Sequence, residues 1–441
     1  MTTSTLGRGP AGTGSFRRSA AHKRPAKASA EITSAQPAPQ ATPQPTSQVG
    51  FRADPAAWPP ERRADLVLSM LQAGLTPAEA ARPCGLDPRV VAAWREEFVQ
   101  AGRQGLCAEA QAARRRERRV YERVDQAVGN TPLVRLNRSV AGFSGEVFAK
   151  LEFMNPMGSI KDRVARHMLQ VAAADGRVAP GTTVVEASSG NTALGLGMMA
   201  VLEGYGCRVV VRDKTSAEKI AALRALGVEV VLCDGSLPPE HPESYNRIMS
   251  RVVAETPGCY FPDQHNNREN NAAHYASTGP ELWEQMEGRI DVLVAGMGTG
   301  GTIGGVARYL KEQDPRIRVV AVEPAGSIFR ELKRTGRPGR PRPYKLEGLG
   351  DEAPIECVEL DRIDEVLQVT DRDAFHAARE LARSDAILAG GSSGAALWAV
   401  RQVIADLDRP ARIVTVFPDG GHRYLSTIYD DGWMRRHSFL D

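Results

Sequence analysis

The sequence predicts an α/β protein built on parallel sheets, preceded by a small helical module and an unstructured tail. Three observations lead to this prediction. Composition changes near residue 55, helix start signals cluster in the next 50 residues, and from about residue 121 apolar runs rich in Val and Ile alternate with amphipathic segments. Apolar runs between helices are typical of strands that are buried on both faces of a parallel sheet.

Residues 1–55 are expected to be a disordered tail. In the first 50 residues, Pro, Ala, Ser, Thr, Gln and Gly fill 37 positions, and Glu31 is the only acidic residue. Such a segment cannot bury enough apolar surface to offset the loss of chain entropy. The basic, Ser-rich start up to Ala30 also resembles an organelle transit peptide, but the prolines that follow and the lack of a clear amphipathic helix favour a tail.

Residues 56–112 are expected to form a module of short helices. Thr76 and Asp87 each precede a proline, a pattern that suits an N-cap followed by the first helical position. A break at Gly85 separates two of the helices, which is the outline of a helix-turn-helix. The stretch 64–106 resembles the helix-turn-helix of bacterial transposases. DNA or protein contact is therefore expected through residues 56–120, and a module for protein contacts explains the pattern equally well.

Residues 113–441 are expected to form one catalytic domain in which strands alternate with helices. The period of the apolar residues places strands at 146–153, 182–187, 207–211, 228–232, 291–297, 317–322 and 412–417. Helices are expected to begin at Lys161, Asn191, Ser216, Pro242, Ile303 and Asp371, and one more follows Ser392.

A glycine-rich turn follows the expected strand 291–297 directly and opens the next helix. Several backbone N–H groups and the positive end of the helix converge there, which favours a bound phosphate. The turn matches neither the Walker A loop nor the G-x-G-x-x-G dinucleotide pattern. A turn that serves only tight strand-to-helix packing is the alternative. The expected phosphate ligands are Gly298, Thr299, Gly300, Gly301 and Thr302.

Two further segments at strand-to-helix junctions point to an imine-forming cofactor. Lys161 stands at the start of a helix, where the helix dipole and partial desolvation would lower the pKa of its ammonium group. A structural lysine paired with Asp162 is the alternative. The S-S-G-N-T turn at 188–192 offers an anion site suited to a carboxylate. A phosphate cradle, a junction lysine and a carboxylate turn together indicate a pyridoxal phosphate site.

The chain from about Val124 to Leu440 resembles the cystathionine β-synthase and cysteine synthase family of fold type II pyridoxal phosphate enzymes. This resemblance implies a tryptophan synthase β-like fold with two parallel-sheet subdomains. Its motifs occur in family order: G-N-T-P-L-V at 129, G-S-I-K-D-R at 158, S-S-G-N-T at 188, P-D-Q-H-N-N at 262, H-Y-A-S-T-G-P-E at 274, G-T-G-G-T-I at 298, G-G-S-S-G-A at 390 and F-P-D-G-G-H-R-Y-L-S at 417.

The resemblance implies a role for each motif residue. Lys161 would carry the cofactor as an imine and act as base and acid at Cα. Asn191 would contact the ring hydroxyl, and Ser392 would face the pyridine nitrogen. A hydroxyl partner does not keep that nitrogen protonated, which favours elimination at Cβ over transamination. The expected carboxylate site comprises Ser188, Ser189, Gly190, Asn191, Thr192 and Gln264, and the loop at 347–350 is expected to close over the substrate.

The resemblance also implies β-replacement on serine or an O-activated serine through an aminoacrylate intermediate. Sulfide as the nucleophile, which makes a cysteine synthase, is the preferred reading. The alternatives are homocysteine in a cystathionine β-synthase reaction, an amine in a 2,3-diaminopropionate-type synthase, and a DNA-binding regulator with an enzyme-derived sensor domain. Family members suggest a homodimer.

Charge and cysteine usage bear on the surroundings of the protein. Residues 1–128 contain 19 Lys and Arg against 12 Asp and Glu, while the whole chain has a net charge of only +3. The six cysteines are dispersed, with no spacing typical of a disulfide framework or a metal site. No apolar stretch is long enough to span a membrane. We therefore expect a cytoplasmic enzyme without a bound metal.

Overall fold

The computed structural model describes residues 58–116, 120–188, 190–213, 215, 217–234, 237 and 241–441. It separates into two compact units, Met1–Arg116 and Glu117–Asp441. The expected disordered tail, residues 1–55, lies outside the described residues. The expected boundary at residue 112 lies within a helix that continues to Arg116.

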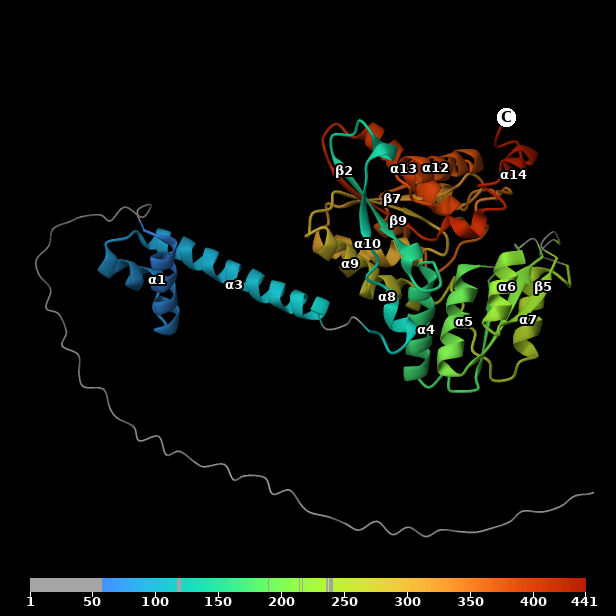
Figure 1. Ribbon diagram of the computed structural model, residues 1–441, viewed down its shortest axis with the longest axis horizontal. Helices are drawn as coiled ribbons and strands as arrows, with labels where there is room; N and C mark the ends of the chain where they lie inside the picture. Colours follow the sequence, from blue (N-terminus) through green and yellow to red (C-terminus); the bar gives the residue numbers. More distant parts are fainter. Residues whose placement is uncertain are drawn as a thin grey trace, which may run out of the picture. The chain divides into compact units, whose positions relative to one another are not determined.

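The described part of the N-terminal unit, residues 58–116, contains three α-helices, α1 (Pro60–Gln72), α2 (Pro77–Ala81) and α3 (Pro88–Arg116), which Figure 1 shows in blue to cyan. Thr76 caps α2 as expected, because its hydroxyl accepts the N–H of Glu79 and the Glu79 carboxylate accepts the N–H of Thr76. A short 3-10 turn and Gly85, which has a φ of 66°, separate α2 from α3. Trp58 and Trp94 pack in the small core, with ring centroids 5.8 Å apart.

The charge of this unit is unevenly distributed along its sequence. Residues 58–102 contain five arginines and six acidic residues, whereas residues 103–119 contain six arginines and two acidic residues. On the three-helix core, Arg89 is paired with Asp87 at 2.8 Å. A contact with DNA through this unit therefore stays a prediction, for which the core itself offers no net positive charge.

The second unit is built on a six-stranded sheet and a three-stranded sheet. The larger sheet has the order β1-β2-β9-β6-β7-β8, and all its neighbours are parallel except β1 and β2. Its strands are β1 (Leu133–Leu136), β2 (Glu146–Leu151), β6 (Val292–Gly296), β7 (Arg318–Pro324), β8 (Glu365–Val369) and β9 (Arg412–Phe417).

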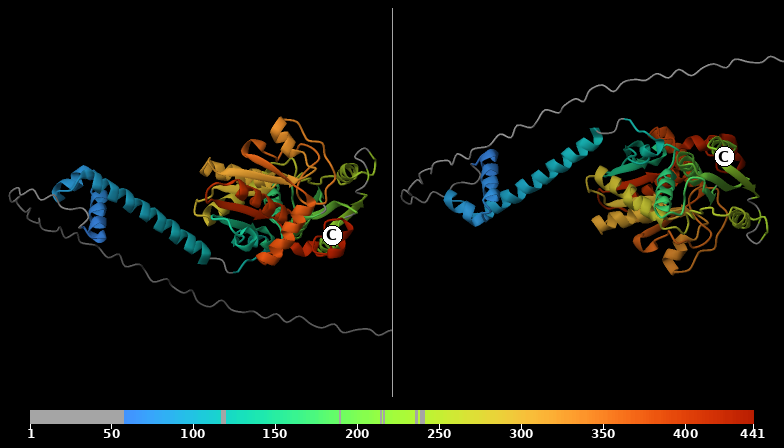
Figure 2. Two further views of the ribbon diagram at one scale, coloured as in Figure 1. Left: turned by 90° about the horizontal axis from the view of Figure 1, so that it is seen from above. Right: turned by 90° about the horizontal axis from the view of Figure 1, so that it is seen from below.

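Both faces of the larger sheet are covered by helices, as the apolar runs predict. Val292 and Val294 point to a core formed with α12 (Asp371–Ser384) and α13 (Gly391–Asp406). Leu293 and Ala295 point to the opposite core, formed with α9 (Thr278–Gln285), α10 (Gly301–Gln313) and α11 (Phe329–Thr335). Strand β6 has no polar side chain because its successive side chains face opposite apolar layers. Figure 2 shows the covered sheet from two further sides.

The smaller sheet has the parallel order β3-β4-β5 and forms its own subdomain. Its strands are β3 (Thr183–Ala187), β4 (Gly206–Arg212) and β5 (Glu229–Cys233). The helices that pack around it are α4 (Lys161–Ala174), α5 (Asn191–Glu203), α6 (Ala217–Ala225) and α7 (Tyr245–Ala254). Helix α8 (Glu269–Ala276) lies between α4 and α10, and α14 (Asp431–Arg436) is the last helix.

Most expected elements are present, and a few boundaries differ. The helix expected from Pro242 begins at Tyr245, because the preceding Ser244 is extended. The helix expected from Ile303 already begins at Gly301. Ser216, the expected start of another helix, lies outside the described residues. Among the described residues, no helix combines the length and apolar character that a membrane crossing requires.

Candidate active site

A pocket lies where the larger sheet presents the carboxyl ends of its parallel strands. Neighbouring strands β6 and β9 end at Gly296 and Phe417, and the segments that follow them meet at the pocket. This edge is where open α/β sheets bind ligands. The pocket is lined by Ile160, Lys161, Ala295, Gly296, Gly298, Thr299, Gly300, Thr302, Gly348, Leu349, Val416 and Pro418.

Lys161 begins α4 and reaches this pocket because its segment is tied to the end of β9. The N–H of Ile160 donates to the carbonyl of Pro418 at 2.8 Å, and Ser159 forms an isolated antiparallel bridge with Asp419. Desolvation by the surrounding protein lowers the pKa of Lys161 to about 8, although the negative charge of Asp419 acts in the opposite direction. A substantial fraction of its amine is therefore neutral near physiological pH.

Asp419 is a buried carboxylate next to the lysine. Its Oδ2 accepts hydrogen bonds from Asn191 Nδ2 at 2.9 Å and from the Tyr424 hydroxyl at 2.7 Å, while Oδ1 has no partner within the described part of the chain. Burial raises the pKa of Asp419, and its hydrogen bonds with Asn191 and Tyr424 oppose that effect. Arg423 donates to Asn191 Oδ1 from the other side. The Asn191 amide is therefore held with its nitrogen toward a carboxylate and its oxygen toward a guanidinium.

The glycine turn forms a tight cradle at the start of α10. Gly300 has a φ of 85°, which favours glycine, and occupies the N-cap position. A Cβ atom on Gly298 would lie 2.3 Å from the carbonyl oxygen of Gly348. The backbone N–H groups at the helix start and the hydroxyls of Thr299 and Thr302 are thus available to an anion. This cradle and a lysine of low pKa fit a phosphate ester that carries an aldehyde, as pyridoxal phosphate does.

The expected carboxylate turn, 188–192, follows β3 and includes the first two residues of α5. Thr192 donates to Gln264 Oε1 at 2.6 Å, so the structure brings these two residues together. The Ser188 hydroxyl accepts the N–H of Gly190 at 3.4 Å. Ser189 lies outside the described residues.

Ser392 is buried in the first turn of α13 and does not line the pocket described above. Its neighbourhood is tied to the site through Gly390, whose N–H donates to the carbonyl of Asp419 at 3.0 Å. The role that the resemblance implies for Ser392 remains a prediction.

The loop at 347–350 connects the two subdomains at the pocket. Gly348 and Leu349 line the pocket, and Glu347 forms an ion pair with Lys219 of α6. Lys219 is buried and lies 4.8 Å from the centroid of the Tyr424 ring, whereas the Glu347 side chain is 58% exposed. The acidic member of this pair is therefore the one that solvent reaches.

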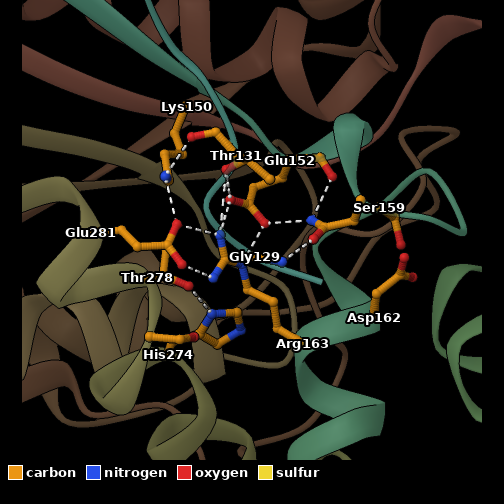
Figure 3. Close-up of polar contacts among 12 residues, drawn as sticks. Gly129, Thr131, Lys150, Glu152, Ser159, Asp162, Arg163, His274, Thr278 and Glu281 are labelled. Atoms are coloured by element: carbon orange, nitrogen blue, oxygen red, sulfur yellow. Dashed lines mark hydrogen bonds and ion pairs between the residues drawn. The ribbon is translucent and has the colours of Figure 1, made fainter. Parts of the chain in front are cut away.

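A buried ionic cluster anchors α4, the helix that begins with Lys161, and Figure 3 shows the contacts of this cluster. Arg163, two residues after Lys161, donates to Glu152 at 2.7 Å and to Glu281 at 2.7 Å. Lys150 is fully buried and donates to Glu281 at 2.7 Å. Two cations and two carboxylates balance each other, which buried charges require. The cluster joins α4 to β2 and α9.

Sequence reasoning missed several polar residues around the pocket. Asp419, Tyr424 and Arg423 all belong to the motif at 417–426, and their position just after an apolar strand was the available signal. Asn270, which donates to Thr299 Oγ1 at 2.9 Å, lies outside the quoted motifs. No local pattern in the sequence indicates that contact.

Comparisons with known proteins place the chain in a family. The family model described as "Pyridoxal-phosphate dependent enzyme" matches residues 124–419. A cystathionine beta-synthase of Apis mellifera is 40% identical over 71% of this chain and 62% of its own length. An N-(2-amino-2-carboxyethyl)-L-glutamate synthase of Ralstonia nicotianae is 39% identical over 72% of this chain and 92% of its own length.

A solved structure, that of a hydrogen sulfide-producing enzyme from Fusobacterium nucleatum, matches with a TM-score of 0.64 and 35% identity. The match covers 69% of this chain and all of that one. The chain spans between 56% and 64% of the length of the cystathionine beta-synthases that it matches. The chain belongs to the family of pyridoxal-phosphate dependent enzymes, has the fold type II architecture and uses pyridoxal phosphate as its cofactor.

Proposed function

We propose that the chain catalyses β-replacement on serine or an O-activated serine. The observation that carries this proposal is the position of Lys161, whose pKa is lowered to about 8, beside an anion cradle and within the field of Asp419. When bound, pyridoxal phosphate supplies an electron sink that makes the α-proton of an amino acid acidic. A lysine of this kind suits the transfer of that proton.

The other residues bind and orient the reactants in this proposal. The N–H groups of residues 298–302 and the two threonine hydroxyls hold the cofactor phosphate. Asn191 donates its remaining amide proton to the ring hydroxyl, because Asp419 already accepts the other one. Thr192, Gln264 and the turn at 188–192 bind the α-carboxylate. Ser392 offers the ring nitrogen a neutral hydroxyl, which favours loss of the β-substituent.

We infer that the nucleophile is itself an amino acid. The sequence alone favoured sulfide, but the names of the relatives above do not support a cysteine synthase. Cystathionine forms when the sulfur of homocysteine attacks Cβ of the serine-type substrate. The name of the Ralstonia enzyme describes a glutamate whose nitrogen carries a carbon chain derived from serine. Both nucleophiles carry a carboxylate, and we propose that the Lys219 ammonium, which is paired with Glu347 of the pocket loop, is the cation that attracts it. Homocysteine is the first candidate, and an amine donor such as glutamate is the second.

The test combines visible spectra with product analysis. Purified protein reconstituted with pyridoxal phosphate receives serine, O-acetylserine or O-phosphoserine in separate samples, and the donor that shifts the cofactor absorbance to longer wavelength is identified. Homocysteine, glutamate and sulfide are then added in turn, and the products are identified by mass spectrometry. Turnover with sulfide but with neither amino acid would refute the proposed nucleophile. Full turnover by Lys161→Ala would refute the proposed chemistry.

A nucleic-acid role for the N-terminal unit is suggested by the succession of α2, a short 3-10 turn and α3. We propose DNA contact only as a second function, alongside catalysis. Gel shifts of the full chain at rising salt test it, because phosphate contacts weaken as salt increases. Salt-independent binding, or none at low salt, would leave a protein contact as the use of this unit. Sedimentation of the same protein tests the expected homodimer.

A further inference from the structure

We propose that Asn270 and His274 of α8 are positioning residues that orient the hydroxyls of Thr299 and Thr302 toward the cofactor phosphate. The inference rests on the proposed placement of the phosphate at residues 298–302. The two residues lie outside the pocket lining. They contact the two threonines and so determine where the two hydroxyl protons point.

Helix α8 packs unusually close to the start of α10. A Cβ atom on Gly301 would lie 2.0 Å from Asn270 Oδ1, and one on Gly305 would lie 2.2 Å from the carbonyl oxygen of Asn271. On Gly304 it would lie 2.6 Å from Asn271 Nδ2. Glycines at 301, 304 and 305 share one helix face, so the two helices approach each other at that face. This closeness places α8 side chains within reach of the cradle.

The hydrogen bonds of Asn270 determine the direction of the Thr299 hydroxyl. Asn270 Nδ2 donates to the carbonyl oxygen of Gln264 at 2.7 Å, and a carbonyl can only accept. The orientation of the amide is therefore fixed, with Nδ2 toward Gln264. The second proton of Nδ2 is donated to Thr299 Oγ1 at 2.9 Å. Because Thr299 Oγ1 accepts from Asn270, its own proton must point elsewhere. Thr299 lines the pocket, so a phosphate oxygen is the available acceptor.

We propose that His274 orients the hydroxyl of Thr302 in the same way as Asn270 orients that of Thr299. His274 is completely buried, and its Nδ1 and Nε2 lie 2.9 Å from Thr278 Oγ1 and 3.2 Å from Thr302 Oγ1. Figure 3 shows the contact of His274 with Thr278. Desolvation, with Lys161 and Arg163 nearby, lowers its pKa well below the usual value, so the ring is neutral and donates from one nitrogen only. The proposal takes the tautomer in which Nε2 donates to Thr302 Oγ1 and Thr278 donates to Nδ1, because that tautomer leaves the Thr302 proton for the phosphate.

A double-mutant cycle tests this indirect action. Apoenzyme is titrated with pyridoxal phosphate, and the Kd is measured by fluorescence for the wild type, Asn270→Ala, Thr299→Val and the double variant. We expect Asn270→Ala to raise the Kd about tenfold, since a hydrogen bond to a charged group is weakened. In the Thr299→Val background, the same change is expected to alter the Kd by less than about twofold. His274→Gln with Thr302→Val forms the parallel cycle.

The 31P resonance of the bound cofactor provides a readout besides affinity and activity. Its chemical shift is expected to move in Asn270→Ala and to stay in place in Asn271→Ala. The control variant removes an amide of the same helix. This amide donates to Cys357 and Glu359 and not to the cradle. Thermal unfolding of each apoenzyme separates loss of fold from loss of binding.

The outcomes are distinguishable. If Thr299→Val and Thr302→Val both leave the Kd unchanged, the phosphate is not where we place it, and the inference fails together with that placement. If these variants weaken binding but Asn270→Ala raises the Kd equally in both backgrounds, Asn270 acts on the fold in general. The inference then fails, while the proposed placement stands.

Discussion

The low pKa of Lys161 has a measurable consequence for how the apoenzyme takes up its cofactor. Covalent attachment to pyridoxal phosphate requires a neutral amine, so the rate of attachment follows the deprotonated fraction of Lys161. With a pKa of about 8, this fraction is about 9% at pH 7, whereas an ordinary lysine with a pKa of 10.5 would be about 0.03% deprotonated. The protein environment therefore increases the reactive fraction roughly 300-fold at that pH.

Stopped-flow absorbance after mixing apoenzyme with excess cofactor measures this rate between pH 6 and pH 10. We expect the rate to rise about tenfold per pH unit below pH 8 and to level off above it. The sign follows from desolvation, which disfavours the ammonium form. A rate that still rises tenfold per unit at pH 9 would refute the reasoning, because Lys161 would then titrate as an exposed lysine does.

The Asp419→Asn variant tests, in the same assay, the direction in which the Asp419 charge shifts the pKa of Lys161. The Asp419 carboxylate is the negative charge that acts on Lys161, because burial raises the pKa of the other nearby group, the Cys357 thiol, to about 12 and leaves it uncharged. Removing this carboxylate is expected to move the plateau to lower pH. A shift to higher pH would show that the carboxylate does not stabilise the ammonium.

Three further predictions concern the frame of the site. Arg163→Met leaves the buried carboxylates of Glu152 and Glu281 without their main partner, so it should lower the free energy of unfolding by about 3–5 kcal/mol in urea denaturation. Arg316→Met removes only an exposed arginine and should leave the urea midpoint nearly unchanged; equal losses would contradict the burial argument. Gly300→Ala forces a side chain into a φ of 85° and is expected to cost at least about 1 kcal/mol and to weaken cofactor binding, which calorimetry can measure. Burial acts to raise the pKa of Glu281, but the hydrogen bonds and charge of Arg163 lower it to about 2 from 4.5. The pKa of Glu281 is lower in the folded than in the unfolded protein, so its contribution to the free energy of unfolding is complete above about pH 4.5 and is lost as the pH falls toward 2. Glu281→Gln should therefore flatten the acid side of a plot of the free energy of unfolding against pH.

Local patterns in the sequence predicted the elements to which we assign the chemistry. Alternation of apolar runs and helices predicted the strands, and the positions of Lys161 and the glycine turn at strand-to-helix junctions follow from the residues next to them. Helix starts and buried parallel strands depend mainly on neighbouring residues, which is why composition and periodicity suffice to find them. The antiparallel β1, the edge strand β8 and helices α8, α9, α11 and α14 were not predicted.

The arrangement of these elements was decided only by the tertiary structure. Strand β9 lies between β2 and β6, and this order brings Asp419 to Lys161 and to Asn191, which is 228 residues away in the sequence. In the same way, the approach of α8 to a glycine face of α10 brings Asn270 to Thr299. The sequence by itself predicted which residues react and which backbone holds a phosphate. The partners that tune and orient those groups come from distant segments, because sheet order and helix packing depend on how all the apolar faces are buried together.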